Sequence, residues 1–474
     1  MKKQNIVFIV SLILLIVIFV SKQSEKKHEE AEANMEEIDS IAIRYQSNCA
    51  SCHGEKLNGF VDRKWKHGSE RENIMASIKS GYLEAGMPSF DALFNEEERG
   101  ELADFILNGV ENAKKYNFDS VMSPIFEAKN LTVRLDTVMA GVQHPWGIAF
   151  LSEGAMLVTE RSGKLYHISS TLDTTVVSGV PPVLAMGQGG LLDVELHPRF
   201  SENKLVYISY SKLVMEGMDS LSTTAVVKGK LNGTSLENVE ELFEAKPALP
   251  TRHHYGSRLV FGNDGYLYFS VGDRGRRDEN PQDLTKDPGK IHRIKDDGSI
   301  PEDNPFVHND NANSTIYSYG HRNPQGLTKH PETGIIWENE HGPRGGDELN
   351  HIRPGLNFGW PVISYGINYD GTVFTTETAR EGMEQPINYW VPSIAPSGFA
   401  IVTGDKYAAW KGDFLIGSLR FRYLNRVRME DGKVIEEESL LKNIGRVRFV
   451  EMGPDGYIYV GVEEPGYVFR LLPQ

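Results

Sequence analysis

The chain has 474 residues, and 40% of them are hydrophobic. This size and content predict two or three domains with at least one large core, and they argue against a disordered protein. The formal net charge is −15 at pH 7. Because a nucleic-acid-binding surface needs a basic stripe, this acidic balance excludes nucleic acid as a partner.

The N-terminus places two lysines before a short apolar run, MKKQNIVFIVSLILLIVIFV. This charge asymmetry is typical of an export signal or a signal-anchor. No small-x-small cleavage site follows, so residues 1–21 are expected to be an uncleaved membrane anchor, with a cleaved signal peptide as the alternative. Either interpretation predicts an exported protein, which would be anchored at the periplasmic face of the inner membrane in the first case and soluble in the periplasm in the second. Residues 22–36 are dense in charge and lack an apolar period, which predicts a tether.

The two cysteines of the chain lie in the run NCASCHG, as Cys49-x-x-Cys52-His53. In an exported protein they could form one disulfide, but CxxCH is the attachment pattern of haem c, in which both thiols bind the haem and the histidine ligates iron. Met87, in a Gly-Met-Pro loop, is the candidate second iron ligand, although a methionine is more often a core filler. Met/His ligation raises the reduction potential, so such a haem would accept electrons from an organic donor.

A helix is predicted to close this small domain. Asn95 is a plausible N-cap, Glu96, Glu97 and Glu98 fall in the first turn, and apolar residues recur at helical spacing up to Val110. With Cys49, Cys52, His53, Gly54 and Met87, this stretch resembles a small class I cytochrome c. The resemblance implies a small all-α domain over residues 37–115 that carries one covalent haem c. Residues 116–135 are expected to form a second linker.

Six related passages follow in the rest of the chain. Each consists of a short apolar strand, a turn rich in Gly, Pro, Asp or Asn, and a second alternating strand. They are GIAFLSEGAMLVTERSGKLYHI, LLDVELHPRFSENKLVYISYS, LVFGNDGYLYFSVGD, GLTKHPETGIIWENEHG, FAIVTGDKYAAWKGDFLIGSL and VRFVEMGPDGYIYVGVEE, which begin at residues 147, 191, 259, 326, 399 and 447. The repeats predict an all-β, six-bladed β-propeller over residues 136–474, with an eight-stranded barrel or a pair of sandwiches as alternatives.

In a propeller, the segments that precede the first strand of each blade emerge at the same rim of the central channel. The polar residues in these segments are Gln188, His253, His254, Arg322, Asn323 and Arg446. Arg420 and Arg448 are expected to reach or approach the same rim. Since guanidinium groups pair with carboxylates, the arginines indicate an anionic ligand with several carboxylates. No Gly-rich phosphate cradle is present in the sequence.

Residues 339–361, NEHGPRGGDELNHIRPGLNFGWP, offer carboxylates and backbone carbonyls in a turn-rich loop. Calcium prefers such oxygen ligands, although an ordinary polar loop is the alternative.

About 330 residues of the chain resemble the pyrroloquinoline quinone (PQQ) dependent aldose sugar dehydrogenases, relatives of soluble glucose dehydrogenase and sorbosone dehydrogenase. The stretches that carry this resemblance are HPWGIAF, GQGGLLDVELHP, HHYGSRLVF, GKIHRI with GSIPEDNPF, YGHRNPQGL, EHGPRGGDELN with NFGWP, and GPDGYIYV.

The resemblance implies roles for individual residues. His254 would be the catalytic base, with His253 where the glucose-specific branch has Asp. The carbonyls of Gly342 and Pro343 would ligate the calcium that holds PQQ, while Glu348 and the carbonyl of Phe358 would ligate a second, structural calcium. The implied PQQ contacts are Gln188, Arg322, Asn323, Arg446, Arg448 and Arg420, the last at a position where the family usually has Lys.

The expected function is oxidation of an aldose at C1 to a lactone. His254 would take the hydroxyl proton, PQQ would take the hydride, and Arg322 would help to hold the reduced cofactor. His253 would orient its neighbour or contact substrate, or it would be structural. Arg258 is expected to be a structural residue at a strand edge. Electrons would pass to the haem and then to a respiratory acceptor. A calcium-dependent hydrolase and a non-catalytic ligand-binding propeller are the alternatives.

Overall fold

The chain folds into two compact units, residues 1–114 and residues 115–474. The structure is a computed structural model, and it describes residues 41–45, 47–49, 53, 57, 60, 65–82, 87–113, 123–369 and 372–474. The predicted anchor and the tether at 22–36 lie outside the described residues. Within the described part of the chain, no helix combines the length and the apolar character that a membrane crossing requires.

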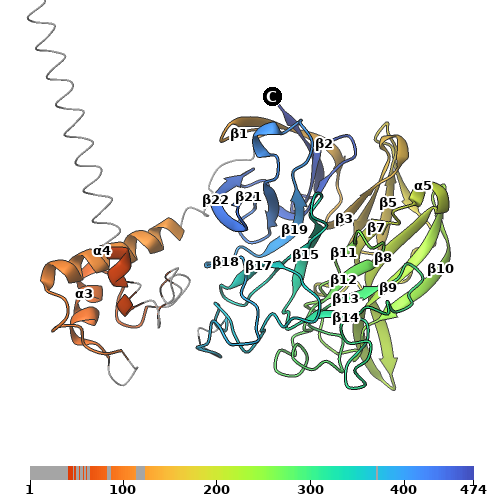
Figure 1. The fold of residues 1–474 in the computed structure, drawn as a ribbon. Coiled ribbons are helices and arrows are strands. Elements are labelled where there is room, and N and C mark those ends of the chain that lie inside the picture. The colour runs from red at the N-terminus through yellow and green to blue at the C-terminus, as the bar shows by residue number, and fades with distance from the viewer. Residues whose placement is uncertain are drawn as a thin grey trace, which may run out of the picture. The chain divides into compact units, whose positions relative to one another are not determined.

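The described part of the N-terminal unit is helical (Figure 1). Its two complete helices are α3 (Arg71–Ser80) and α4 (Glu96–Ala113). The predicted N-cap of α4 is confirmed, because the Asn95 side chain accepts a hydrogen bond from the Glu98 N–H at 3.0 Å. The Glu98 carboxylate in turn accepts a bond from the Asn95 N–H at 2.9 Å, which completes a capping box.

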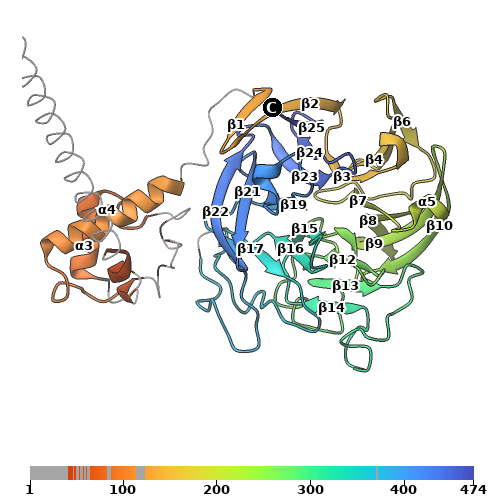
Figure 2. The same ribbon diagram turned by 45° about the horizontal axis from the view of Figure 1, so that its top comes forward.

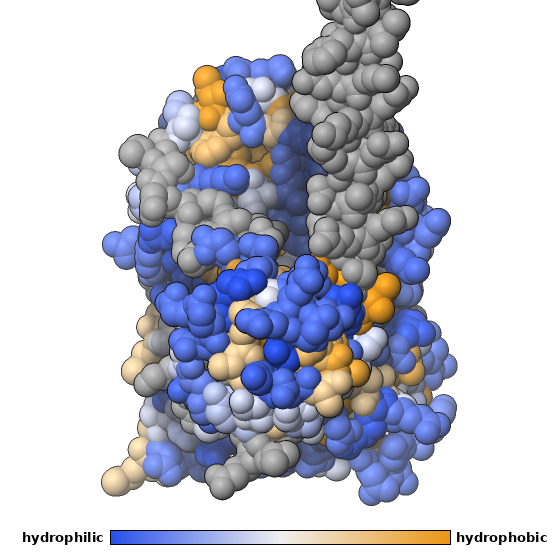
Figure 3. Space-filling model, turned by 90° about the vertical axis from the view of Figure 1, so that its left-hand side faces the viewer, coloured by the Kyte–Doolittle hydropathy of each residue, from blue (hydrophilic) through white to orange (hydrophobic). Residues whose placement is uncertain are grey.

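The small core of this unit joins α4 to the segment before the CxxCH motif. Leu102 and Ile106 of α4 are buried, and the ring of Phe105 lies 5.4 Å from that of the buried Tyr45. The surface in Figure 3 is mainly hydrophilic, with small separate apolar patches. Ile43 and Leu93 are among the exposed apolar side chains of this unit.

The C-terminal unit is a six-bladed β-propeller, which confirms the prediction. Six antiparallel sheets follow one another around a ring (Figure 2). Blade 1 contains β3 (Pro145–Phe150), β4 (Met156–Glu160), β5 (Lys164–Ile168) and β6 (Thr174–Val177); blade 2 contains β7 (Leu191–Leu196), β8 (Leu205–Glu216), β9 (Asp219–Asn232) and β10 (Ser235–Glu244). Blade 3 contains β11 (Leu259–Phe261), β12 (Leu267–Val271), β13 (Lys290–Ile294) and β14 (Ile316–Tyr319).

Blade 4 contains β15 (Pro324–Lys329), β16 (Ile336–Glu340), β17 (Asp347–His351) and β18 (Asn388–Trp390). Blade 5 contains β19 (Pro396–Ile401), β20 (Phe414–Ser418), β21 (Tyr423–Glu430) and β22 (Lys433–Leu440). Blade 6 contains β23 (Arg446–Met452), β24 (Ile458–Glu463), β25 (Tyr467–Pro473), β2 (Leu131–Ala140) and β1 (Ile125–Ala128). In the described part of this unit, three short helices lie between strands: Ser152–Gly154, α5 (Phe200–Asn203) and Ala408–Trp410.

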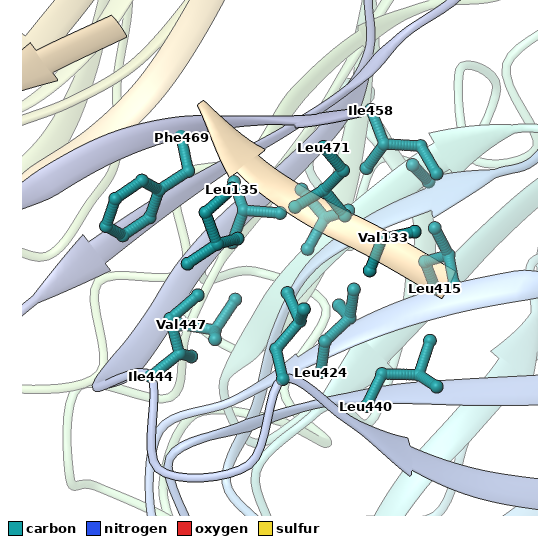
Figure 4. Close-up of a cluster of buried hydrophobic side chains, with 14 of the residues drawn as sticks. Val133, Leu135, Leu415, Leu424, Leu440, Ile444, Val447, Ile458, Phe469 and Leu471 are labelled. Carbon is teal, nitrogen blue, oxygen red and sulfur yellow. The ribbon is translucent and has the colours of Figure 1, made fainter. Parts of the chain in front are cut away.

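Blade 6 closes the ring, because it joins strands from both ends of the propeller. Strand β2 pairs with β25 in an antiparallel register that runs from Val133 opposite Pro473 to Ala140 opposite Tyr467. The assignment of residues 116–135 to a linker is therefore wrong from Ile125 onward, and the propeller begins earlier than residue 136. Val133 and Leu135 of β2 are buried beside Phe469 and Leu471 of β25 (Figure 4), and this packing explains why the segment is a strand.

The first strands of the blades, β3, β7, β11, β15, β19 and β23, neighbour one another around the central channel. Each runs away from the same end of the channel, which we call the mouth. Since neighbouring strands in a blade are antiparallel, the second strand of each blade returns to the mouth. The loops that precede the first strands and the loops that follow the second strands therefore meet at the mouth.

Candidate active site

Two adjoining cavities lie among the mouth loops. The outer cavity, of about 560 Å³, is lined by Gln188, His253, His254, Asp273, Gly275, Arg276, Arg277, Asp278, Glu279, Arg322, Pro343, Trp360, Asn368 and Tyr369. The inner cavity, of about 230 Å³, is lined by Trp146, Arg161, Gln188, Leu192, Tyr255, Gly256, Asn323, Gln325, His341, Ala395, Leu419, Arg446 and Arg448. Gln188 lines both. The loops that the sequence analysis singled out thus converge on one site.

His254 is fixed at the wall of the outer cavity by three contacts. Its backbone N–H donates to Oε1 of Gln188 at 2.8 Å, and its Nδ1 lies 2.7 Å from Oδ1 of Asp273. The ring of His253 meets it edge-on, with the ring centroids 4.6 Å apart. Only 14% of the His254 side chain is exposed. Burial, and then the positive charge of Arg322, lowers the pKa of His254 to about 4 although Asp273 opposes this shift.

Asp273 sets the proton position on His254. Its Oδ1 also accepts the N–H of Gly275 at 2.7 Å, and its Oδ2 accepts Nε1–H of Trp360 at 2.9 Å. Burial alone would raise the pKa of Asp273, but His254, Arg322 and the Gly275 N–H outweigh burial and hold the pKa below its usual value. An ionised Asp273 accepts Nδ1–H of a neutral His254, which leaves the His254 Nε2 lone pair as the base.

The other predicted residues of the outer cavity take distinct places. Arg322 is buried, donates from Nη1 to the His341 carbonyl at 2.9 Å, and lies with its guanidinium 5.3 Å from the centre of the Trp360 ring. His253 lines the cavity, and burial lowers its pKa. Pro343 also lines this cavity, and the N–H of Gly342 donates to Asp347 at 2.8 Å.

The inner cavity is strongly basic. Arg446 and Arg448 both pair with Glu463, at 3.2 Å and 2.8 Å. Burial by itself would raise the pKa of Glu463, but Arg448, Arg446 and Arg161 outweigh it and bring the pKa down to about 2. Burial, together with Arg448 and Arg322, holds the pKa of His341 well below its usual value. The cavity therefore presents cations and a neutral histidine to whatever it binds.

Of the four arginines that were predicted to contact PQQ, Arg420 alone is absent from the described residues that line the two cavities. It follows Leu419, which lines the inner cavity, and its Nη1 donates to the Ser393 carbonyl at 3.1 Å. Asn323, by contrast, lines the inner cavity and accepts the N–H of Gly256 at 3.2 Å.

Beside Arg322, whose backbone N–H donates to Glu340, lies an acidic cluster formed by the buried His321, Glu338 and Glu340 and the partly buried Glu348. One ligand atom from each of His321, Glu338 and Glu340 lies within 4.8 Å of the others. Glu348 of β17 stands opposite Glu340 of β16. Phe358, the other predicted ligand of a structural calcium, stacks its ring on His321 with centroids 4.7 Å apart. The two predicted ligands therefore lie beside one cluster.

In the N-terminal unit, the structure describes part of the predicted haem site. The His53 N–H donates to the Cys49 carbonyl at 2.9 Å, so a backbone hydrogen bond joins these two residues. Met87 exchanges two backbone hydrogen bonds with Tyr82, at 2.8 Å and 3.1 Å. Cys52 lies outside the described residues. The ligation of iron by His53 and Met87 stays a prediction.

The sequence analysis missed Asp273, Trp360 and Arg161. Arg161 directly follows β4, in the sequence TER, and Asp273 lies two residues after the end of β12, in the sequence VGD. The sequence could have indicated Asp273 and Arg161. In a blade of antiparallel strands, the loop after the second strand lies at the same end of the channel as the loop before the first strand. Trp360 reaches the site from the long connection between β17 and β18, for which the repeat pattern gives no position.

The comparisons with known proteins assign both units to known families. The family model described as "Glucose / Sorbosone dehydrogenase" matches residues 142–470, and that described as "Cytochrome C oxidase, cbb3-type, subunit III" matches residues 36–106. The chain is 40% identical to aldose sugar dehydrogenase YliI of Escherichia coli over 363 residues, which are 74% of this chain and 96% of the relative.

Solved structures extend the match to the fold. The apo-form of the soluble aldose sugar dehydrogenase of Escherichia coli superposes on this chain with a TM-score of 0.69 at 39% identity. The match covers 72% of this chain and 100% of the chain in that structure. The PQQ-bound form of the aldose sugar dehydrogenase of Streptomyces coelicolor superposes on this chain with a TM-score of 0.59 at 26% identity. The match covers 75% of this chain and 100% of the chain in that structure. The protein belongs to the glucose/sorbosone dehydrogenase family of PQQ-type sugar dehydrogenases, and it carries that family's six-bladed propeller together with an N-terminal cytochrome c domain.

Proposed function

We propose that the protein is a quinoprotein that oxidises aldoses at C1 to lactones and passes the electrons to its own haem c. One observation carries this proposal: a neutral, buried His254, oriented by Asp273, lines a cavity that shares Gln188 with an arginine-lined inner cavity. The arrangement offers a base for the sugar and cations for an anionic cofactor in adjoining spaces.

The residues of the inner cavity fit PQQ, which is a flat molecule with several carboxylates. Arg446 and Arg448 are the principal cations there, and Asn323 adds an amide. Guanidinium groups bind carboxylates bidentately, so this donor set suits such an anion better than a neutral ligand. A calcium-dependent hydrolase would give these arginines no role. Bound PQQ would supply the two-electron acceptor that takes hydride from C1 of the sugar.

The chain's own residues would do the proton chemistry. His254 takes the proton of the C1 hydroxyl at Nε2, while Asp273 holds Nδ1–H and stabilises the imidazolium that forms. Loss of this proton and of a hydride leaves a carbonyl at C1, which is the lactone. Arg322 adds positive charge beside the reacting atoms, and Trp360 fixes Asp273 from the opposite side. His253 contributes a polar surface to the substrate cavity.

Calcium would bind at two places. The carbonyls of Gly342 and Pro343 would hold the ion that contacts PQQ, where it would act as a Lewis acid. The loop that carries them is held by Asp347, whose Oδ1 accepts from Gly342 N–H and whose Oδ2 accepts from the backbone N–H groups of Ile394 and Ala395.

The second ion would lie in the acidic cluster, with Glu348 and the Phe358 carbonyl among its ligands. The Asn350 amide donates to Oε2 of Glu338 at 3.1 Å and to Oε2 of Glu348 at 3.2 Å. Oε1 of Glu338 and Oδ1 of Asn350 are buried with no hydrogen-bond partner among the described residues. Burial, and then the charge of Glu340, raises the pKa values of Glu338 and Glu348 well above the usual value. A divalent cation would compensate these oxygens.

Removal of calcium is expected to destabilise the propeller, because the acidic cluster would lose its counter-charge. Calcium at about 100 times its dissociation constant should raise Tm by roughly 5 °C relative to chelator-treated protein. The measurement is thermal unfolding followed by tryptophan fluorescence. Glu348→Gln should reduce this shift by removing the contribution of the ion in the acidic cluster, whereas the exposed Glu237→Gln on β10 should keep it. A parent protein whose Tm ignores calcium would contradict the proposed structural ion.

The cytochrome c domain would be the first electron acceptor. Cys49 and Cys52 would bind haem c covalently, and His53 and Met87 would ligate the iron. Because both redox centres belong to one chain, transfer between them would be intramolecular at high effective concentration. A respiratory acceptor would take the electrons onward at the periplasmic face of the inner membrane, with the N-terminal segment as anchor. The proposal is tested by whether aldoses reduce the haem of the full chain only when PQQ and calcium are present.

A further inference from the structure

The inner cavity holds more positive charge than the predicted PQQ contacts account for. Three guanidinium groups line it, from Arg161, Arg446 and Arg448, and none of the described residues that line it is acidic. The carboxylate nearest to them is that of Glu463, which already pairs with both Arg446 and Arg448. Three cations therefore share one carboxylate, and the remaining positive charge would be compensated by an anionic ligand.

Of the three lining arginines, Arg161 is the one that has no hydrogen-bond or ion-pair partner for its side chain among the described residues. Its side chain is nevertheless partly buried. Burial, and then the charges of Arg448 and Arg446, lowers its pKa although Glu463 opposes this shift. A partly buried cation beside two others is costly unless an anion compensates it.

The backbone holds Arg161 firmly at this place. It lies in the turn between β4 and β5, where its N–H donates to the His144 carbonyl at 3.1 Å and its carbonyl accepts the Leu191 N–H at 3.2 Å. Gly190 makes room for the side chain, since a Cβ there would lie 2.6 Å from Cγ of Arg161 and 1.8 Å from its carbonyl oxygen. The left-handed φ of +153° at Gly190 also favours glycine.

A second polar group beside Arg161 lacks a partner. Nδ1 of His144 is buried with no hydrogen-bond partner among the described residues, and it lies 3.9 Å from Oε2 of Glu463. Burial, and then the charge of Arg161, lowers the pKa of His144. His144 is therefore neutral, and it does not supply a negative charge to Arg161.

We propose that Arg161 binds a carboxylate of PQQ directly, as a third guanidinium beside Arg446 and Arg448. This inference rests on the proposed function, and it adds a cofactor-binding residue from blade 1 to those of the other blades. The cofactor's anionic end would then lie in the inner cavity, between blade 1 and blade 6.

The test is the affinity of the calcium-loaded full chain for PQQ, measured by equilibrium dialysis with free PQQ read from its absorbance. This measurement needs no turnover. Arg161→Met should weaken PQQ binding by about 10- to 100-fold, the effect expected for loss of a charge-assisted hydrogen bond. Arg134→Met should leave the affinity unchanged, because Arg134 is exposed on β2 and lines neither cavity.

An affinity of Arg161→Met within twofold of the parent would overturn the inference, and so would an equal loss in Arg134→Met. If Arg161→Met fails to fold, Arg161→Lys tests the inference instead. Lysine keeps the aliphatic chain and the positive charge but lacks the planar guanidinium that binds a carboxylate bidentately. Arg161→Lys should bind PQQ several-fold more weakly, and parental affinity would contradict a bidentate contact. If the parent itself binds no PQQ, the proposed function fails, and the inference fails with it.

Discussion

Replacement of His254 by Gln is expected to lower kcat for aldose oxidation by about 10²- to 10⁴-fold while PQQ still binds. Glutamine keeps a polar side chain but cannot accept and hold a proton. The measurement is steady-state dye reduction with saturating PQQ and calcium, together with dialysis for PQQ affinity. The exposed His308→Gln is the matched control and should retain parental activity. Activity of His254→Gln within twofold of the parent would rule out His254 as the base.

The pH profile of the parent adds a second check on His254. A base acts when it is deprotonated, so activity is present above its pKa and is lost as the pH falls through it. Burial and Arg322 lower the pKa of His254 to about 4, so the acid limb of kcat/KM should lie near pH 4 rather than near the usual histidine value of about 6.5. An acid limb near pH 6.5 would contradict a buried, neutral His254.

Replacement of Arg258 by Met is expected to destabilise the propeller by about 3–5 kcal/mol. Arg258 is buried in the central channel and pairs with Asp193 at 3.2 Å. It also donates to the carbonyls of Gln325, Trp146 and Arg448 at 2.7 Å, 3.1 Å and 2.7 Å. From blade 3 it thus joins blades 1, 2, 4 and 6. Methionine would leave Asp193 as an uncompensated buried charge.

Denaturant unfolding of the chain, followed by tryptophan fluorescence, measures this loss. The double variant Arg258→Met with Asp193→Asn should lose less stability than Arg258→Met alone, because it removes the unpaired charge together with its partner. The exposed Arg199→Met is the matched control and should change the free energy of unfolding by less than about 0.5 kcal/mol. A cost below about 1 kcal/mol for Arg258→Met would show that the channel contacts of Arg258 are weak.

The propeller could be predicted because each blade contains a local signal. In every blade the first two strands are consecutive in the sequence and pair with each other, as β11 and β12 do around the turn from Gly262 to Gly265. Pairing within a hairpin is set by nearby residues, so the sequence shows it directly. The convergence of Gln188, His254 and Arg322 then followed from the common direction of the first strands.

Strands β1 and β2 could not be placed in the same way. Strand β1 pairs with β2, and β2 pairs with β25, which lies at the far end of the chain, so no nearby residue marks the pairing that joins them to blade 6. The buried side chains of Val133, Leu135 and Val138 do follow strand spacing in part, and this was the only local signal. Closure of the ring is what makes the segment a strand.

Arg258 shows a different limit. Its position just before β11 indicated a strand edge, but its long side chain enters the channel and contacts four other blades. The acidic cluster is similar, because Glu340 and Glu348 lie on neighbouring strands and stand opposite each other only through the register of β16 and β17. Such sites depend on the three-dimensional arrangement of several blades, which no single stretch of sequence specifies.

The most direct test of the account is rapid mixing of the full chain, loaded with PQQ and calcium, with a panel of aldoses while the absorbance of reduced haem is followed. The account predicts that haem reduction requires PQQ, calcium and sugar together, and that His254→Gln slows it by about 10²- to 10⁴-fold. Haem that stays oxidised with every aldose, in protein shown to hold PQQ, would contradict the proposed path from sugar to haem.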